Sequence, residues 1–180
     1  MIDRGTLPLE TERLRLRRFT IDDAGDMFDN WAADEMVTAY LCWAAHSALA
    51  DSRKIIEEWL AGYADKRQYL WCIEHKADQK AIGSIGVVAR NPETLIMDIG
   101  YCLSRRYWGR DLMPEALNSV VRYLFDRVGV PGLEARIDQR NTKSKRVLEK
   151  CGFRFDRIET GDDRNRFGRY DAHIFSLKQS

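Results

Sequence analysis

The feature that most constrains this chain is a single change of hydrophobic period near its middle. The alternation of a β-strand face appears at Leu95, Met97, Ile99, Tyr101 and Leu103. Helical spacing follows at Leu117, Val120, Val121, Leu124 and Val128. A turn that leads from strand to helix directs the unpaired N–H groups of the helix start outward, and the helix dipole adds partial positive charge there. Such a turn can bind a phosphate or pyrophosphate, or it can be a simple connection.

The length and composition of the chain favour a single domain spanning residues 1–180. Hydrophobic residues make up 44% of the chain and charged residues 32%, which is an ordinary balance for a protein that buries a core. The formal net charge is only +1, so bulk charge gives no attraction to nucleic acid or to an anionic membrane. The longest apolar run, residues 39–45, is too short to cross a bilayer, and we recognise no secretory signal. We therefore expect neither a nucleic-acid partner nor a membrane partner.

The cysteine and histidine positions argue against a disulfide framework or a metal site. The cysteines are widely spaced and form no C-x-x-C pair: Cys42, Cys72, Cys102 and Cys151. Free thiols of this kind fit a reducing cytoplasm, which is the compartment we expect. The histidines are isolated in sequence, so no metal is predicted. The sequence also lacks a G-x-S-x-G motif, which disfavours a serine hydrolase.

The order of the predicted elements indicates an α/β domain of the α+β type. Strands are predicted at residues 13–19, 69–74, 81–89, 94–104 and 133–138, with two more in the tail around a charged loop, 161–168. Helices are predicted at residues 22–31, around 54–63, after the central turn, and at 141–151. Residues 32–47 are aromatic-rich and have no clear period. This order predicts a mixed, largely antiparallel sheet.

Two motifs around the central turn carry a family resemblance. The first is Arg106-x-x-Gly109-x-Asp111, and the second is Asn141-x-x-Ser144 leading to Glu149-Lys150-Cys151-Gly152-Phe153. Together with Tyr107-Trp108-Gly109 and Glu115-Ala116-Leu117, they resemble the GNAT superfamily of acyl-CoA-dependent N-acetyltransferases. Within it the chain is most similar to the RimJ/RimL-type branch, whose named members acetylate the N-termini of ribosomal proteins. The resemblance covers nearly the whole chain.

The resemblance implies a splayed sheet of about six to seven strands flanked by about four helices. Acetyl-CoA, the implied cosubstrate, would lie in a V-shaped gap between residues 98–104 and 133–138. The implied phosphate loop consists of Arg106, Tyr107, Trp108, Gly109, Arg110, Asp111, Leu112 and Met113.

Asp111 departs from the family pattern, which has a small residue at the end of the phosphate loop. A carboxylate ~5 Å from a pyrophosphate would cost about 3 kcal/mol per unit charge at an effective dielectric of about 20. That cost corresponds to roughly a hundredfold loss of affinity. The alternative, which we favour, is that the Asp111 side chain turns outward and caps the helix that Pro114 starts.

Acetyl transfer needs hydrogen-bond donors that hold the thioester carbonyl, a neutral amine that attacks it, and stabilisation of the thiolate that leaves. The resemblance assigns the carbonyl to backbone N–H groups around Tyr101, Cys102 and Leu103. Asp98 is our candidate general base, because its strand neighbours are apolar and burial would raise its pKa. The alternative is a carboxylate that faces solvent or pairs with an arginine.

The leaving thiolate is expected to meet the helix at residues 141–151. Asn141, Ser144 and Leu148 fall on one stripe of this helix. Many GNAT enzymes have a tyrosine acid where Leu148 stands, but leucine has no proton to give. Ser144 is therefore our candidate hydrogen-bond donor to sulfur, and Asn141 would orient the amide arm of the cofactor. Both residues are also favoured at helix starts simply as capping residues.

The remaining expectations concern the acceptor and other partners. Tyr40 and Trp43 are predicted walls of the acceptor pocket, although aromatic residues there could equally be core. The basic side of the last helix could meet the terminal phosphate of the cofactor or could simply be a solvated face. We expect direct attack in a ternary complex on a protein N-terminus. The alternatives are a small amine (amino acid, polyamine or antibiotic) and a non-catalytic acyl-CoA-binding domain. Exposed strand edges allow a homodimer.

Overall fold

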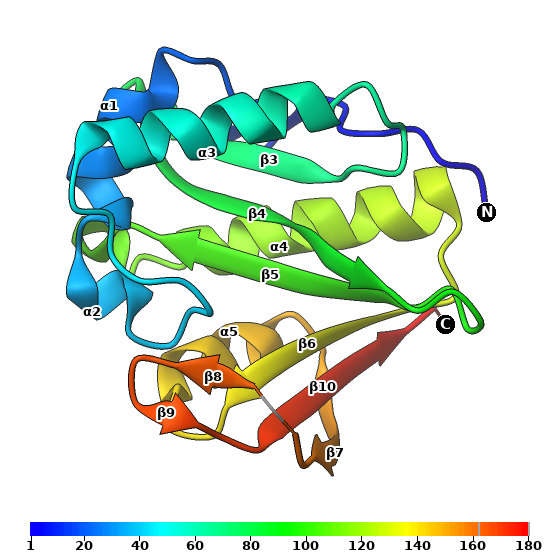
Figure 1. Ribbon diagram of the computed structural model, residues 1–180. Helices are drawn as coiled ribbons and strands as arrows, with labels where there is room; N and C mark the ends of the chain where they lie inside the picture. Colours follow the sequence, from blue (N-terminus) through cyan, green and yellow to red (C-terminus); the bar gives the residue numbers. More distant parts are fainter. Residues whose placement is uncertain (162, 180) are drawn as a thin grey trace.

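The computed structural model describes residues 1–161 and 163–179 (Figure 1). The strands are β1 (Leu9–Glu10), β2 (Leu14–Arg17), β3 (Leu70–His75), β4 (Lys80–Arg90), β5 (Met97–Leu103), β6 (Gly132–Asp138), β7 (Arg154–Glu159), β8 (Arg164–Asn165), β9 (Gly168–Arg169) and β10 (Ala172–Lys178). The α-helices are α1 (Asp23–Met27), α2 (Glu35–Thr38), α3 (Leu49–Gly62), α4 (Leu112–Arg122) and α5 (Thr142–Lys150). The π-helical turns η1 (Phe28–Ala32) and η3 (Tyr123–Val128) extend α1 and α4, and η2 (Arg105–Tyr107) is a 3-10 turn.

A mixed, mostly antiparallel sheet forms the middle of the molecule. In the described part of the chain it has eight strands in the order β1-β2-β3-β4-β5-β6-β10-β7, and β8 and β9 form a separate hairpin. The pair β5–β6 is parallel, and the other neighbouring pairs are antiparallel. The sheet therefore has more strands than the six to seven that the sequence predicts. The strand that the sequence does not predict is β1, because two residues are too few to create an alternating pattern.

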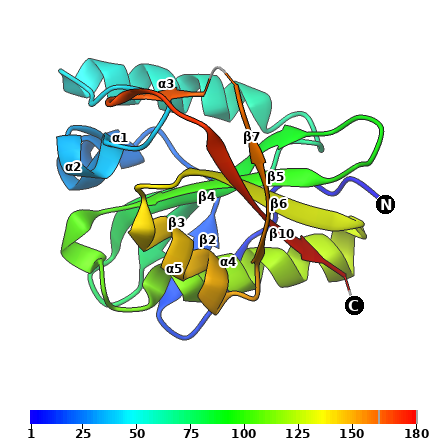
Figure 2. The ribbon, with the colours of Figure 1, turned by 90° about the horizontal axis from the view of Figure 1, so that it is seen from below.

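The sheet separates two hydrophobic cores (Figure 2). On one face, α4, η3 and α5 bury Leu117, Leu124 and Leu148, respectively, against the strands. On the other face, α1, η1 and α3 bury Trp31 and Ile56. The alternation along β5 follows from this arrangement, since its odd-numbered apolar residues face the first core. No helix of the described residues is both long and apolar enough to cross a bilayer.

The parallel strands β5 and β6 diverge, and this divergence creates the gap that the resemblance implies. Their pairing consists of Met97 with Leu133 and Asp98 with Glu134. Figure 1 shows the two strands together at that end and apart at the other, where α2, η2 and the start of α5 lie. Over residues 99–103, β5 continues to pair with β4 but not, among the described residues, with β6. One edge of β5 is therefore free to bind a ligand.

The helical elements differ from the sequence expectation mainly in residues 32–47. The sequence indicates no regular element there, whereas the structure contains the single-turn helix α2. Its N-cap is Asp34, whose side chain accepts a hydrogen bond from Met36 N over 2.9 Å. One helical turn is too short to give a recognisable period, so pattern alone could not predict it.

Candidate active site

A cavity of about 770 Å³ fills the wide end of the gap between β5 and α5. Of the predicted site residues, those that line it are Tyr40, Tyr101, Cys102, Leu103, Tyr107, Trp108, Gly109, Asp111, Leu112, Met113, Asn141 and Ser144. Asp98, Trp43, Arg106 and Arg110 do not line it. The structure thus brings most of the predicted residues from three separate stretches of the chain, around residue 40, 101–113 and 141–144, into one cavity.

The turn between β5 and α4 presents a row of free backbone donors. Gly109 has a φ of +75°, a conformation that glycine adopts without strain, and nothing lies within 4 Å of where its Cβ would be. It is therefore the backbone conformation, and not lack of space, that requires glycine here. Among the described residues, the N–H groups of residues 109–113 have no hydrogen-bond acceptor. Together with the start of α4 they form a site for an anion.

The Asp111 side chain pairs with α5 and not with this row of donors. Its backbone is left-handed (φ +56°), and its carboxylate forms an ion pair with the ammonium group of Lys150 on α5. The side chain is 62% exposed, which agrees with the expectation that it turns outward. The expectation that it caps α4 is wrong, because the carboxylate makes no capping hydrogen bond and is held by Lys150 instead.

The start of α4 is fixed by Glu115 to the turn between β1 and β2, a contact that sequence reasoning did not identify. Its carboxylate accepts hydrogen bonds from Thr11 Oγ1 (2.5 Å), Arg13 N (2.9 Å) and Arg13 Nε (2.7 Å). The Glu115 N–H in turn donates to the Asp111 carbonyl over 3.2 Å. These bonds join α4 to a turn that lies about a hundred residues earlier and hold the anion-binding turn in place.

The free edge of β5 presents the N–H groups of Tyr101 and Leu103 to the cavity. Ser104 N donates to Ile82 O on β4 over 2.7 Å, and donor direction alternates along a strand. The Cys102 N–H therefore points to β4, which corrects its predicted role as a donor to the cofactor. Its thiol belongs to the smaller core and lies 3.3 Å from Ser84 Oγ, and burial raises the pKa of that thiol. Trp108 Nε1 donates to Leu103 O over 2.8 Å and closes the end of this edge.

Asp98 lies where β5 and β6 separate, opposite Glu134. Burial raises its pKa to about 7, although the positive charge of Arg136 partly opposes this effect. Its Oδ1 atom is buried and has no hydrogen-bond partner among the described residues. The expected effect of burial on this carboxyl is therefore confirmed. Asp98 sits at the closed end of the gap, beyond the residues that line the cavity, and its role as a base stays a prediction.

Helix α5 presents Asn141 and Ser144 to the cavity, but not Leu148. Asn141 is the N-cap, and its Oδ1 accepts a hydrogen bond from Ser144 N over 3.1 Å. The Ser144 hydroxyl lies 2.8 Å from the Tyr101 hydroxyl. Leu148 is fully buried in the larger core, so the expected single stripe is wrong at this position. Val147 faces the cavity instead, because α5 must bury Leu148 to pack on the sheet.

Basic side chains of α5 also reach the cavity. Lys143, Arg146 and Lys150 line it, and Lys143 Nζ lies 3.7 Å from the centre of the Trp108 ring. Lys145 does not line the cavity and pairs with Glu149 on the helix surface over 3.8 Å. The basic residues of α5 are therefore divided between the cavity and a solvated face. Arg106 and Arg110 are exposed side chains, with Arg110 placed over the Tyr107 ring, so neither forms the cavity wall.

The far end of the cavity is closed by the β8–β9 hairpin. Phe167 is at the tip of the hairpin, and its ring centre lies 5.3 Å from that of Tyr40. The Arg140 guanidinium lies 5.1 Å from the Phe167 ring centre. Arg166 pairs with Glu35 over 3.0 Å and ties the hairpin to α2. Sequence reasoning missed Phe167 because it sits alone in a charged loop. Trp43, a predicted wall, instead packs against the smaller core beside His46.

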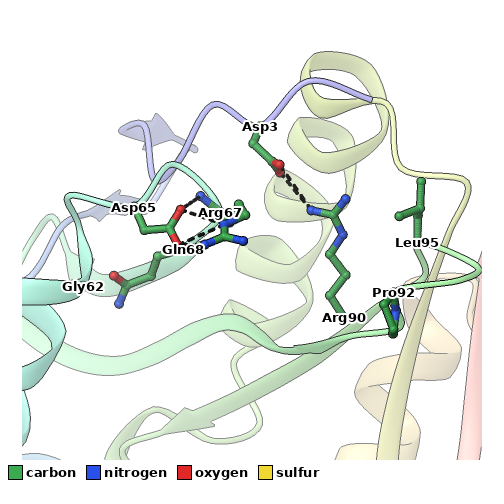
Figure 3. Close-up of a pocket in the computed structure, with 8 residues that line it drawn as sticks. All are labelled: Asp3, Gly62, Asp65, Arg67, Gln68, Arg90, Pro92 and Leu95. Carbon is green, nitrogen blue, oxygen red and sulfur yellow. Dashed lines mark hydrogen bonds and ion pairs between the residues drawn. The ribbon is translucent and has the colours of Figure 1, made fainter.

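A second hollow of about 650 Å³ lies at the end of β4 that is formed by Arg90 (Figure 3). Its two guanidinium groups are matched by carboxylates, Arg67 with Asp65 over 2.8 Å and Arg90 with Asp3 over 3.2 Å. The charges in this hollow are thus compensated within the chain. It also has no row of backbone donors comparable to residues 109–113, so we place the functional site in the larger cavity.

Comparisons with known proteins agree with this geometry. The chain matches the model of the acetyltransferase (GNAT) domain family over residues 13–154. It is 30% identical over 169 residues to the uncharacterized N-acetyltransferase YoaA of Bacillus subtilis, covering 94% of this chain and 95% of that protein. It is 27% identical over 173 residues to the uncharacterized N-acetyltransferase p20 of Bacillus licheniformis, covering 94% of each.

Solved structures share the fold at lower sequence identity. The ribosomal L7/L12 alpha-N-protein acetyltransferase RimL, in complex with coenzyme A, superposes with a TM-score of 0.84 at 14% identity, covering 96% of this chain and 98% of that chain. The microcin C7 self-immunity acetyltransferase MccE, in complex with acetyl-CoA and AMP, gives 0.84 at 18% identity and 94% coverage of each. The ribosomal-protein-S5-alanine acetyltransferase of Vibrio fischeri gives 0.82 at 18% identity and 96% coverage of each.

Proposed function

The chain belongs to the GNAT family of acetyltransferases, and from this premise we propose that it transfers acetyl from acetyl-CoA to the N-terminal amine of a protein or peptide. The reaction proceeds by direct attack of the amine in a ternary complex, within one domain that spans residues 1–180. The observation that carries the proposal is the row of free N–H groups at residues 109–113, at the end of a strand with one unpaired edge. A diphosphate and the extended arm attached to it need these two features side by side.

The residues present fit acetyl-CoA along its whole length. The N–H groups beside Gly109 would hold the diphosphate, and Lys143 and Arg146 would add positive charge near its phosphates. The N–H groups of Leu103 and Tyr101 would bind the arm and the thioester carbonyl. RimL and MccE hold coenzyme A and acetyl-CoA, respectively, in the same fold, which supports this placement.

Asp98 would accept the proton that the amine loses, directly or through a water molecule. A pKa of about 7 makes its carboxylate a proton acceptor near neutral pH. The amine nitrogen forms a bond to the acetyl carbon, and the carbon–sulfur bond breaks with its electron pair on sulfur. The proton released by nitrogen passes to Asp98 and then to solvent, and the thiolate takes a proton from solvent.

The charges around the cavity favour a protein N-terminus over a polyamine or an aminoglycoside. The basic side chains that line it are Arg140, Lys143, Arg146, Lys150 and Arg166. Among the described lining residues the only carboxylate is that of Asp111, which pairs with Lys150. Arg140 pairs with Asp138, Lys150 with Asp111 and Arg166 with Glu35, so a polycation would meet the charges of Lys143 and Arg146, which form no ion pair among the described residues. A peptide has a single α-amine, which is partly neutral at pH 7–8 and is ready to attack.

The experiment offers purified protein acetyl-CoA with peptides that have free N-termini, with the same peptides blocked at the N-terminus, and with spermidine and single amino acids. Release of free thiol measures transfer, and mass spectrometry locates the acetyl group. We expect transfer to the free α-amine, none to the blocked peptides and little to spermidine. Preferred acetylation of a small amine would replace the proposed acceptor. Acetyl-CoA binding without transfer to any amine would favour a non-catalytic acyl-CoA-binding domain.

Acetyl-CoA binding at the turn can be tested separately with two glycine variants. Gly109 and Gly25 both have open space at the position of a Cβ, but only Gly109 has a positive φ. Gly109→Ala should weaken acetyl-CoA binding in calorimetry by about tenfold or more, because the strained backbone reorients the donor row. Gly25→Ala, in α1, should leave affinity unchanged.

A further inference from the structure

Tyr101 lines the cavity, and its hydroxyl makes a contact that its backbone role does not explain. The ring packs against the larger core, and the hydroxyl oxygen lies 2.8 Å from Ser144 Oγ and 3.2 Å from Ser144 O. Tyr101 belongs to β5 and Ser144 to α5, so this contact crosses the gap between them. The hydroxyl is therefore held at the junction of β5 and α5, between two residues that line the cavity.

The position of Tyr101 along β5 places its hydroxyl near the reacting end of a bound acyl thioester. The donor row at residues 109–113 lies at one end of the cavity, and Asp98 lies at the closed end of the gap. From Leu103 to Tyr101 the strand advances about 7 Å toward Asp98, at 3.3–3.4 Å per residue. A carrier arm that follows the free edge of β5 therefore passes Leu103 first and has Tyr101 beside its far end.

We propose that the Tyr101 hydroxyl, oriented by Ser144, donates the hydrogen bond that stabilises the sulfur leaving group during acetyl transfer. This role rests on the proposed function, since it requires an acyl thioester in the cavity. As the carbon–sulfur bond breaks, its electron pair becomes negative charge on sulfur, and Tyr101 O–H turns toward it. Ser144 O–H then donates to the Tyr101 oxygen. No proton leaves Tyr101, because the thiolate later takes its proton from solvent.

The chemistry of the two hydroxyls makes Tyr101 the donor to sulfur and Ser144 the donor to Tyr101. Burial raises the pKa of the Tyr101 hydroxyl well above its usual range, whereas an ordinary thiol ionises near pH 8.5. Tyr101 therefore stays protonated beside a thiolate and acts as a donor, not as an acid. The other titratable group that influences it is the Cys151 thiol at the end of α5. The hydroxyl of Tyr107, another residue that lines the cavity, already donates to Asp78 Oδ2 over 2.6 Å.

The experiment measures the pKa of the thiol of bound coenzyme A by its ultraviolet thiolate absorbance, in the wild type and in Tyr101→Phe. Loss of the donor should raise the pKa of the bound thiol by about one unit and slow single-turnover acetyl transfer by about 10- to 100-fold. Affinity for acetyl-CoA should change by less than about threefold, since the thioester sulfur is uncharged. Tyr123→Phe removes a hydroxyl that donates to Gly5 O in the core and is the matched control.

Ser144 is a positioning residue in this scheme. Ser144→Ala should raise the pKa of the bound thiol by less than Tyr101→Phe does, and Ser144→Thr, which keeps a hydroxyl, should restore the wild-type value. Equal thiol pKa values in the wild type and Tyr101→Phe would overturn the proposal. A shifted thiol pKa in a protein that acetylates no amine would contradict the proposed acceptor but support the role of Tyr101. Failure of coenzyme A to bind would overturn both.

Discussion

The Asp111 carboxylate and the Lys150 ammonium group form an ion pair that connects the start of α4 to the end of α5. Both side chains are more than half exposed, so the pair adds little to folding stability. Its importance is local, because it neutralises the acid that stands beside the free N–H groups of residues 109–113. The departure from the family loop at Asp111 is thus compensated by a residue of another helix.

This compensation predicts how acetyl-CoA affinity responds to the two side chains. Lys150→Met should weaken binding by about tenfold, because it leaves the Asp111 carboxylate uncompensated near the diphosphate. Asp111→Asn alone should change affinity by less than about threefold, and the double variant should recover most of the loss. Calorimetry at low and high salt measures these effects, which should shrink as salt screens the charges. Additive effects in the double variant would contradict the compensation.

The role proposed for Asp98 predicts a pH-dependent rate. In the wild type, kcat/KM should rise as pH increases through about 7, because the carboxyl must lose its proton to act as a base. Asp98→Asn should lower turnover by about a hundredfold or more and remove that rise. Asp156→Asn changes an exposed carboxylate on β7 and serves as the control. An unchanged rate in Asp98→Asn at both neutral and high pH would exclude Asp98 as the base.

The same carboxyl predicts a stability effect that does not depend on activity. Its pKa is raised from about 3.9 in the unfolded chain to about 7 in the folded protein, so the folded state binds its proton more tightly. Stability from this group is therefore fully present below pH 4 and is lost as pH rises from about 4 to 7. Asp98→Asn, which cannot ionise, should raise the free energy of unfolding by roughly 4 kcal/mol at pH 8 but not at pH 4. Urea unfolding at the two pH values tests this difference.

The position of the β8–β9 hairpin at the far end of the cavity predicts that a change in it alters acceptor binding alone. Phe167→Ala should raise the KM for the acceptor by about tenfold. The change removes the ring that packs against Tyr40 and over which the Arg140 guanidinium lies. The dissociation constant of acetyl-CoA should stay the same. Phe155→Ala is a matched control, since Phe155 on β7 is 52% exposed and Phe167 is 51% exposed. An equal effect of both variants on the acceptor KM would show that the hairpin does not form the acceptor site.

The sequence by itself determined the strand, the turn and the helix between Met97 and Arg122, together with the family. These features depend on local information, since hydrophobic period and a glycine with a positive φ act within a few residues. It also determined that burial would raise the pKa of Asp98, because the apolar neighbours of that residue are visible in the chain.

Only the tertiary structure decided which distant side chains share the cavity. Leu148 faces the core and Trp43 packs away from the cavity, while Phe167 closes it and Tyr101 meets Ser144. The contact between Tyr101 and Ser144 joins residues 43 positions apart, and it exists because β5 and β6 separate after two paired positions. The physical reason is that period shows which face of an element is apolar, whereas the packing of elements against one another decides what that face meets.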